Sequence, residues 1–290
     1  MIALLLIAIA LIAALSGPVT PSADAADSKG PKTLLGSIFG SSGRQDGHEE
    51  EERLDPDRPH FPEATTTVGK GRVILETGYT FTEKRSSFSS QTYPEALLRV
   101  GMFAEWFEFR IGQNFLRQEQ TVAGTTTRES GAQDLYLGVK LALIEQDGYV
   151  PQIALIPQMT VPTGSKGVTA GRVLPGVNVD FSWEIVKDLF DVELLIATNS
   201  VADGNLESHV EVATGLTAAV ALTRKLQAFV EWDAFYPVGS GGADTGTRHY
   251  AVGGLIYFFT KNLAVDVRAG VGLNRQANDV IAGTGFAVRY

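Results

Sequence analysis

Few side chains in this sequence are of types that perform covalent or acid–base chemistry near neutral pH. Cysteine is absent, and histidine occurs only at positions 48, 60, 209 and 249. Ser208 and His209 are adjacent, so on an extended strand they point to opposite faces and cannot act as nucleophile and base. His209 and Glu211 share one face, but such a pair more often forms a hydrogen bond than a metal site. We therefore expect no catalytic residue, no metal and no cofactor.

Charged side chains instead recur at every second position of segments that are otherwise apolar. Glu108 and Arg110, for example, alternate with Phe107, Phe109 and Ile111, which places the two charges on one face of a strand and the apolar side chains on the other. The candidates for this polar face, expected to line a lumen, are Arg72, Glu76, Glu95, Arg99, Glu108, Arg110, Asp134, Lys140, Asp180, Glu184, Glu231, Asp233, Asp266, Arg268 and Arg289.

Two roles are open for these charges. They could pair across strands and fill a narrow interior, since buried charges without partners are costly. They could also line a polar path whose acidic excess favours cations or neutral solutes.

The elements that would position these charges are strands. Between Arg72 and Tyr290 the sequence alternates between apolar and polar residues in about twelve segments. The expected strands are 72–82, 93–101, 105–114, 132–143, 149–161, 173–185, 189–198, 208–222, 225–236, 248–259, 263–272 and 280–290. Their connections are alternately short and long, as in an antiparallel meander whose two ends face different compartments.

This pattern predicts an all-β fold, namely a closed antiparallel up-and-down transmembrane β-barrel of about 12 strands. A soluble β-sandwich is the alternative, because its strands alternate in the same way. Aromatic residues near strand ends favour the barrel, since aromatic girdles mark both membrane interfaces. These residues are Phe81, Phe107, Trp183, Trp232, Tyr236 and Phe258. The last strand alternates Phe286, Val288 and Tyr290 and ends on an aromatic residue, similar to the signal read by the barrel insertion machinery.

The N-terminal part of the sequence has a different composition. An apolar run over 2–15 and an A-x-A site at 23–25 predict a signal peptide at 1–25, with an uncleaved inner-membrane anchor as the alternative. Residues 26–70 hold Ser, Gly and Pro clusters and an acidic run at 49–52, which predict a flexible periplasmic segment before a barrel at 71–290. The net charge of −9 argues against nucleic acid as a partner.

Several motifs are similar to those of one family. Asp57–Glu63 reads D-R-P-H-F-P-E, and the likeness continues through Leu75–Phe81, Pro94–Gly101, Asp134–Lys140 and Val161–Ser165 to the last strand. The chain thereby resembles the MetA-pathway of phenol degradation family from position 55 to its C-terminus. The resemblance implies an outer-membrane barrel with a role in the uptake of aromatic or other small compounds, and it supplies no catalytic residues.

We therefore expect a channel or transporter in the outer membrane of a Gram-negative-type bacterium, not an enzyme. It would pass small solutes, aromatic or other hydrophobic compounds among them, through a charged lumen gated by outer connections such as 115–131. Its expected partners are outer-membrane lipid, the barrel insertion machinery and a small solute. The alternative is a structural or adhesive barrel with a closed lumen, which would act through its outer loops.

Overall fold

The computed structural model describes residues 31–39, 53–85, 87–202, 208–239 and 246–290. The expected signal peptide and the acidic run at 49–52 lie outside these residues. Within the described residues, no helix has the length and apolar character needed to cross a membrane.

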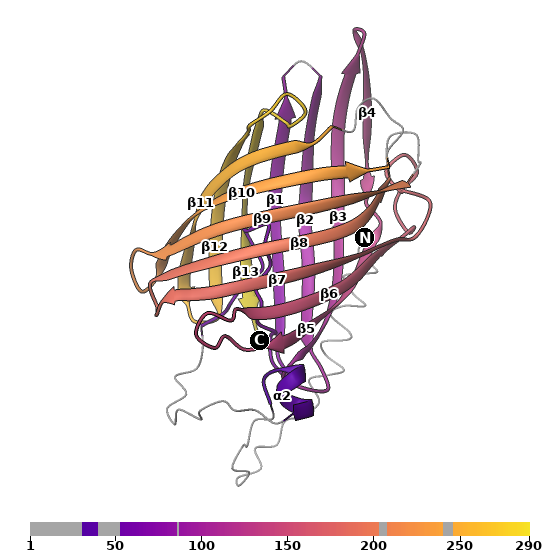
Figure 1. Cartoon of the computed structure of the whole chain (residues 1–290). Coiled ribbons are helices and arrows are strands. Elements are labelled where there is room, and N and C mark those ends of the chain that lie inside the picture. The colour runs from indigo at the N-terminus through magenta and orange to yellow at the C-terminus, as the bar shows by residue number, and fades with distance from the viewer. Residues whose placement is uncertain (1–30, 40–52, 86, 203–207, 240–245) are drawn as a thin grey trace.

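One antiparallel sheet contains all thirteen described strands and closes on itself (Figure 1). The strands are β1 (Val73–Lys84), β2 (Phe88–Gly101), β3 (Phe107–Val122), β4 (Thr125–Ala132), β5 (Leu135–Ile144), β6 (Gln152–Val161), β7 (Leu174–Val186), β8 (Phe190–Ala202), β9 (Ser208–Ala221), β10 (Leu226–Val238), β11 (Arg248–Thr260), β12 (Leu263–Gly272) and β13 (Val280–Arg289). Closure comes from β1, which pairs with both β2 and β13. Because β3 pairs with β4 and then β5, these two short strands act as one, and the barrel has the predicted twelve strands.

The alternation predicted from the sequence sets which side chains face inward. On β3, Glu108 and Arg110 are buried inside the barrel, while Phe109 between them is not. Phe109 pairs with Val100 of β2 and Val139 of β5, so the outer surface carries apolar side chains side by side. Such an outward apolar band is what a lipid environment requires.

The short and long connections lie at opposite ends of the barrel, but two connections expected to be long are not. β1 runs to Lys84 and β2 begins at Phe88, so the expected connection at 83–92 is mostly strand. The segment 115–131 is not a loop, because β3 and β4 continue past the barrel rim as a hairpin closed by Ala123 and Gly124 (Figure 1). Both turn residues have positive φ, as a two-residue hairpin turn requires. Cross-strand polar pairs stabilise the extension, such as Arg128 with Glu119 at 2.9 Å. The sequence pattern failed here because both faces of this hairpin are polar.

Part of the interior is apolar, which alternation did not predict. Phe258, expected in an outward aromatic girdle, is 3% exposed and points inward. It packs with Ile74 and Ile256 of the wall and with Leu54 and Val68, which precede the first strand. Phe258 therefore faces inward because apolar residues of the chain before β1 lie inside the barrel and pack against it.

A short helix, α2 (Leu34–Phe39), precedes these residues and lies against β5 at the short-turn end (Figure 1). The Thr33 hydroxyl accepts a hydrogen bond from the Gly36 backbone N–H at 3.2 Å and caps its first turn.

Candidate functional site

The barrel lumen is occupied by residues 53–70 of the same chain, which we call the lumen segment. It enters and leaves at the short-turn end. There the Leu54 N–H donates to the Lys261 carbonyl at 2.8 Å, and the Lys70 N–H donates to the Glu105 carboxylate at 3.1 Å. The flexible periplasmic segment predicted for 26–70 is thus wrong for residues 53–70. The physical reason is that their polar groups find partners on the barrel wall rather than in water.

Wall carboxylates bind the backbone of the lumen segment. A segment without strand or helix partners must satisfy its buried N–H groups in another way. The acceptors are inward-facing side chains from β1, β3, β7 and β10. The bonds run from Asp57 N and Arg58 N to Glu76 at 3.0 Å each, from Phe61 N to Glu231 at 2.9 Å, from Glu63 N to Asp180 at 2.9 Å, and from Val68 N to Glu108 at 3.0 Å.

Asp57 of the lumen segment lies at the centre of a buried charge cluster. Its carboxylate is 2.7 Å from Arg110, 2.7 Å from Lys140 and 3.2 Å from Arg99. Arg99 is fully buried and also contacts Glu108 at 2.8 Å. Burial alone would raise the pKa of Asp57, but the neighbouring cations outweigh it and hold that pKa well below its usual range. The cluster therefore joins the segment to β2, β3 and β5 through paired ions.

Arg58 lies in a notch of the adjacent wall, where β1 and β13 pair. Its guanidinium contacts Glu95 at 2.7 Å and Asp266 at 3.3 Å. Gly78 and Gly285 are paired across β1 and β13, and a Cβ added at either would come within 3.0 Å of the Arg58 side chain. Glycine at these two positions is therefore what allows the guanidinium to approach the wall.

Two aromatic residues of the lumen segment make further contacts. The Phe61 ring lies 5.0 Å from that of Phe235, beside the buried Leu195. His60 contacts Glu193 at 3.0 Å and the edge of the Phe229 ring. The segment is thus held by apolar as well as ionic contacts.

The predicted lumen residues occupy three kinds of position. Those buried inside the barrel are Glu76, Arg99, Glu108, Arg110, Lys140, Asp180, Glu231, Asp233 and Asp266. Glu95, Asp134 and Arg268 are less buried and border cavities, as do the buried Glu76, Arg110, Glu231 and Asp233. Arg268 donates to the Pro59 carbonyl at 2.7 Å. Arg72, Glu184 and Arg289 lie at the short-turn end, where Glu184 is exposed and Arg289 contacts Asn262.

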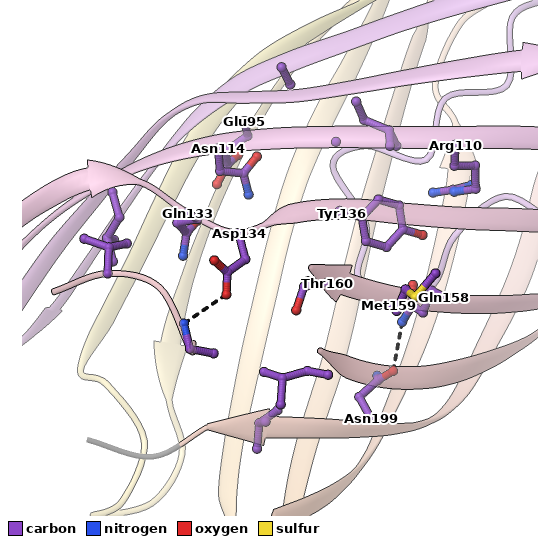
Figure 2. A pocket seen from close by; sticks show the side chains of 18 of the residues that line it. Glu95, Arg110, Asn114, Gln133, Asp134, Tyr136, Gln158, Met159, Thr160 and Asn199 are labelled. Atoms are coloured by element: carbon purple, nitrogen blue, oxygen red, sulfur yellow. Dashed lines mark hydrogen bonds between the residues drawn. The ribbon is translucent and has the colours of Figure 1, made fainter. Parts of the chain in front are cut away.

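Among the described residues, a larger and a smaller cavity lie between the lumen segment and the long connections. The larger has a volume of about 950 Å³ and the smaller about 290 Å³. Figure 2 shows the larger cavity, which is lined by Asn114 of β3, by Thr160 and Gln158 of β6, and by Gln133 between β4 and β5. Its rim includes residues 167–170, whose connection is tied to β5 because Asp134 accepts the N–H groups of Gly164 and Ala170 at 2.9 Å.

Sequence reasoning missed the residues of the lumen segment and the amides of the cavity. The motif Asp57–Glu63 was available only as a family likeness, because it has no periodicity. Its three charged residues match inward charges of opposite sign, as in Arg58 with Asp266. That match becomes visible only once the barrel is closed. Within the described residues, no group of three or more His, Asp and Glu side chains is arranged to hold a metal ion.

Comparisons with known proteins agree with this geometry. The family model described as "Putative MetA-pathway of phenol degradation" matches residues 56–290. No curated protein sequence matches the chain. An outer-membrane channel from Pseudomonas putida F1 superposes with a TM-score of 0.65 at 12% identity, covering 84% of this chain and 99% of that one. The NanC porin superposes with a TM-score of 0.48 at 12% identity, covering 74% of this chain and 98% of the porin. The fold is thus that of an outer-membrane channel, and the chain belongs to the family whose model it matches from the Asp57–Glu63 motif to its last residue.

Proposed function

We propose that this protein is an outer-membrane channel for small solutes in which the lumen segment is the constriction. The observation that carries the proposal is the arrangement along the barrel axis. A polar cavity of about 950 Å³ lies on the long-connection side, and the segment separates it from the short-turn end. Family membership and the shared barrel fold support the same function.

Passage requires the lumen segment to shift, because its buried contacts fill the lumen below the cavity. Every contact that holds it is non-covalent. The segment is attached to the barrel through the short link to β1, so it can move without unfolding the wall. The solute would enter the cavity first and pass when the segment moves.

One observation favours a second function, a barrel with a permanently closed lumen. Arg99, Arg110 and Lys140 are almost fully buried and paired with carboxylates, which is the arrangement expected if the charges only fill the interior. Such a protein would act through its exposed loops, among them the polar β3–β4 hairpin.

A reversible crosslink separates the two functions. The chain has no cysteine, and the hydroxyls of Thr65 in the segment and Ser182 in β7 are 2.7 Å apart. The double variant Thr65→Cys, Ser182→Cys should conduct in planar bilayers when reduced and lose conductance when oxidised. The matched control is Thr121→Cys, Thr126→Cys in the β3–β4 hairpin, where the hydroxyls are 2.9 Å apart.

The control should conduct equally in both redox states. Equal conductance of the Thr65–Ser182 variant in both states would show that solutes pass without movement of the segment. No conductance from native, reduced or oxidised protein would favour the closed barrel.

A further inference from the structure

The larger cavity is lined by charges that already have protein partners. Glu95 is paired with Arg58 at 2.7 Å, and Glu129 accepts from Gln118 at 2.8 Å. Asp134 accepts two backbone N–H groups, as described above. A charged solute would therefore have to compete with existing bonds, and an anion would also meet the acidic excess of this lining.

Uncharged polar groups in the same cavity are available instead. Among the described residues, no hydrogen-bond partner contacts the side-chain amides of Asn114 and Gln133 or the hydroxyl of Thr160. The Gln158 amide nitrogen donates to Asn178 at 3.0 Å and to Asn199 at 2.9 Å, which fixes its orientation and leaves its oxygen as an acceptor. Figure 2 shows these groups around one open space.

The chemistry of these groups selects for hydroxyl and carbonyl groups. A side-chain amide offers both donors and an acceptor, and a solute hydroxyl can use either. Leu97, Leu116 and Leu174 also border the cavity and provide apolar surface for the carbon skeleton. Small-molecule sites commonly combine such apolar walls with a few placed polar groups, in volumes of about 300–1,000 Å³.

We propose that this cavity is a binding site for an uncharged solute that carries several hydroxyl or carbonyl groups and is small enough to fit a volume of about 950 Å³. The proposal rests on the proposed channel function and names its solute class. The amides of Asn114 and Gln133 bind the solute directly. Gln158 is held by Asn178 and Asn199 so that its oxygen accepts a solute hydroxyl.

Three probes of similar size and different charge test the proposal: glucose, gluconate and glucosamine. Binding is measured by saturation-transfer NMR on the full chain in detergent, which reports weak binding and does not require transport. Glucose should bind about fivefold or more tightly than either charged probe, and Gln133→Met should weaken glucose binding by about fivefold. Asn114→Leu should have the same effect.

The control variant is Gln152→Met. Gln152 lies on β6 and faces inward as Gln158 does, but it does not border the cavity. It should bind glucose as the native protein does. Tighter binding of glucosamine, equal binding of all three probes, no binding of glucose, or no effect of Gln133→Met would each overturn the proposal.

Conductance is measured in parallel on the same preparations. Glucose binding without conductance would reject the channel and leave the site standing. Conductance without selective glucose binding would reject the site and leave the channel standing.

Discussion

A single methyl group in the barrel wall should loosen the lumen segment. In Gly78→Ala, the new Cβ would lie within 3.0 Å of the Arg58 guanidinium, closer than the 3.5–4.0 Å or so of a normal contact. Arg58 must then move by about 1 Å, so its 3.3 Å contact with Asp266 exceeds hydrogen-bonding distance. A hydrogen bond to a charged group contributes about 1.5–3 kcal/mol. The open population of the segment should therefore rise about 10- to 150-fold.

Cysteine labelling measures that population. Thr65 is buried in the native protein, and the absence of natural cysteines makes Thr65→Cys a single-site reporter. The rate of reaction with a water-soluble maleimide follows the open fraction when the segment recloses faster than it reacts. Gly78→Ala should raise this rate by the factor above.

The matched control is Gly253→Ala. Gly253 is a strand glycine on the outer face of β11, and its added Cβ would meet only the Phe229 carbonyl at 3.3 Å and the Val230 side chain. Its labelling rate should equal that of the parent. If Gly78→Ala labels no faster than Gly253→Ala, the notch does not hold Arg58 and the reasoning fails.

Other perturbations act on different contacts. Burial lowers the pKa of His60, but the Glu193 carboxylate outweighs it and raises that pKa above its usual value of about 6.5. The ion pair is therefore complete below that value and is lost as the pH rises through the raised pKa. Thiolate formation speeds maleimide labelling of every variant as the pH rises, so labelling at position 65 should accelerate more steeply in the His60 parent than in His60→Gln. Asp57→Asn should lower the free energy of unfolding by about 3–5 kcal/mol in urea titrations, because it leaves buried cations with one anion fewer. Phe109→Arg on the outer face should cost about 2–4 kcal/mol in the same assay near the membrane midplane; no loss would mean that residue 109 does not face lipid.

The strands could be predicted from the sequence because each one has an apolar face toward the outside of the barrel and a polar face toward its interior. Glu108 and Phe109 must face opposite sides wherever a strand divides an apolar exterior from a polar interior. The alternation along the strand is therefore enough to predict which of them faces inward. The prediction was wrong where one of those environments changes. Beyond the rim both faces of β3 and β4 are polar, and at the short-turn end Phe258 has an apolar interior to pack against.

The lumen segment could not be predicted because nothing local specifies its conformation. Its composition is that of a flexible linker, and its bonds join residues far apart in the chain, such as Arg58 with Asp266. Wall positions are nevertheless shaped to it. A Cβ at Gly215 would meet Phe61 and Pro62, and one at Gly101 would meet the Gly69 carbonyl. In the sequence these glycines only interrupt the alternation, with no sign of what approaches them.

This fit changes how the inward charges must be interpreted. Parity identifies Glu76, Asp180 and Glu231 as lumen-lining acids, which predicts an interior attractive to cations. In the folded chain these carboxylates accept backbone N–H groups of the lumen segment, so they are engaged before any solute arrives. Under the proposed function, a solute meets side chains nearer the long connections. There the amides of Asn114 and Gln133, which have no hydrogen-bond partner among the described residues, lie beside acids such as Glu95 and Asp134 that are already paired. The inward acids predicted from the alternation therefore hold the lumen segment in place. Under the proposed function, selectivity depends on the uncharged groups of the cavity on the long-connection side.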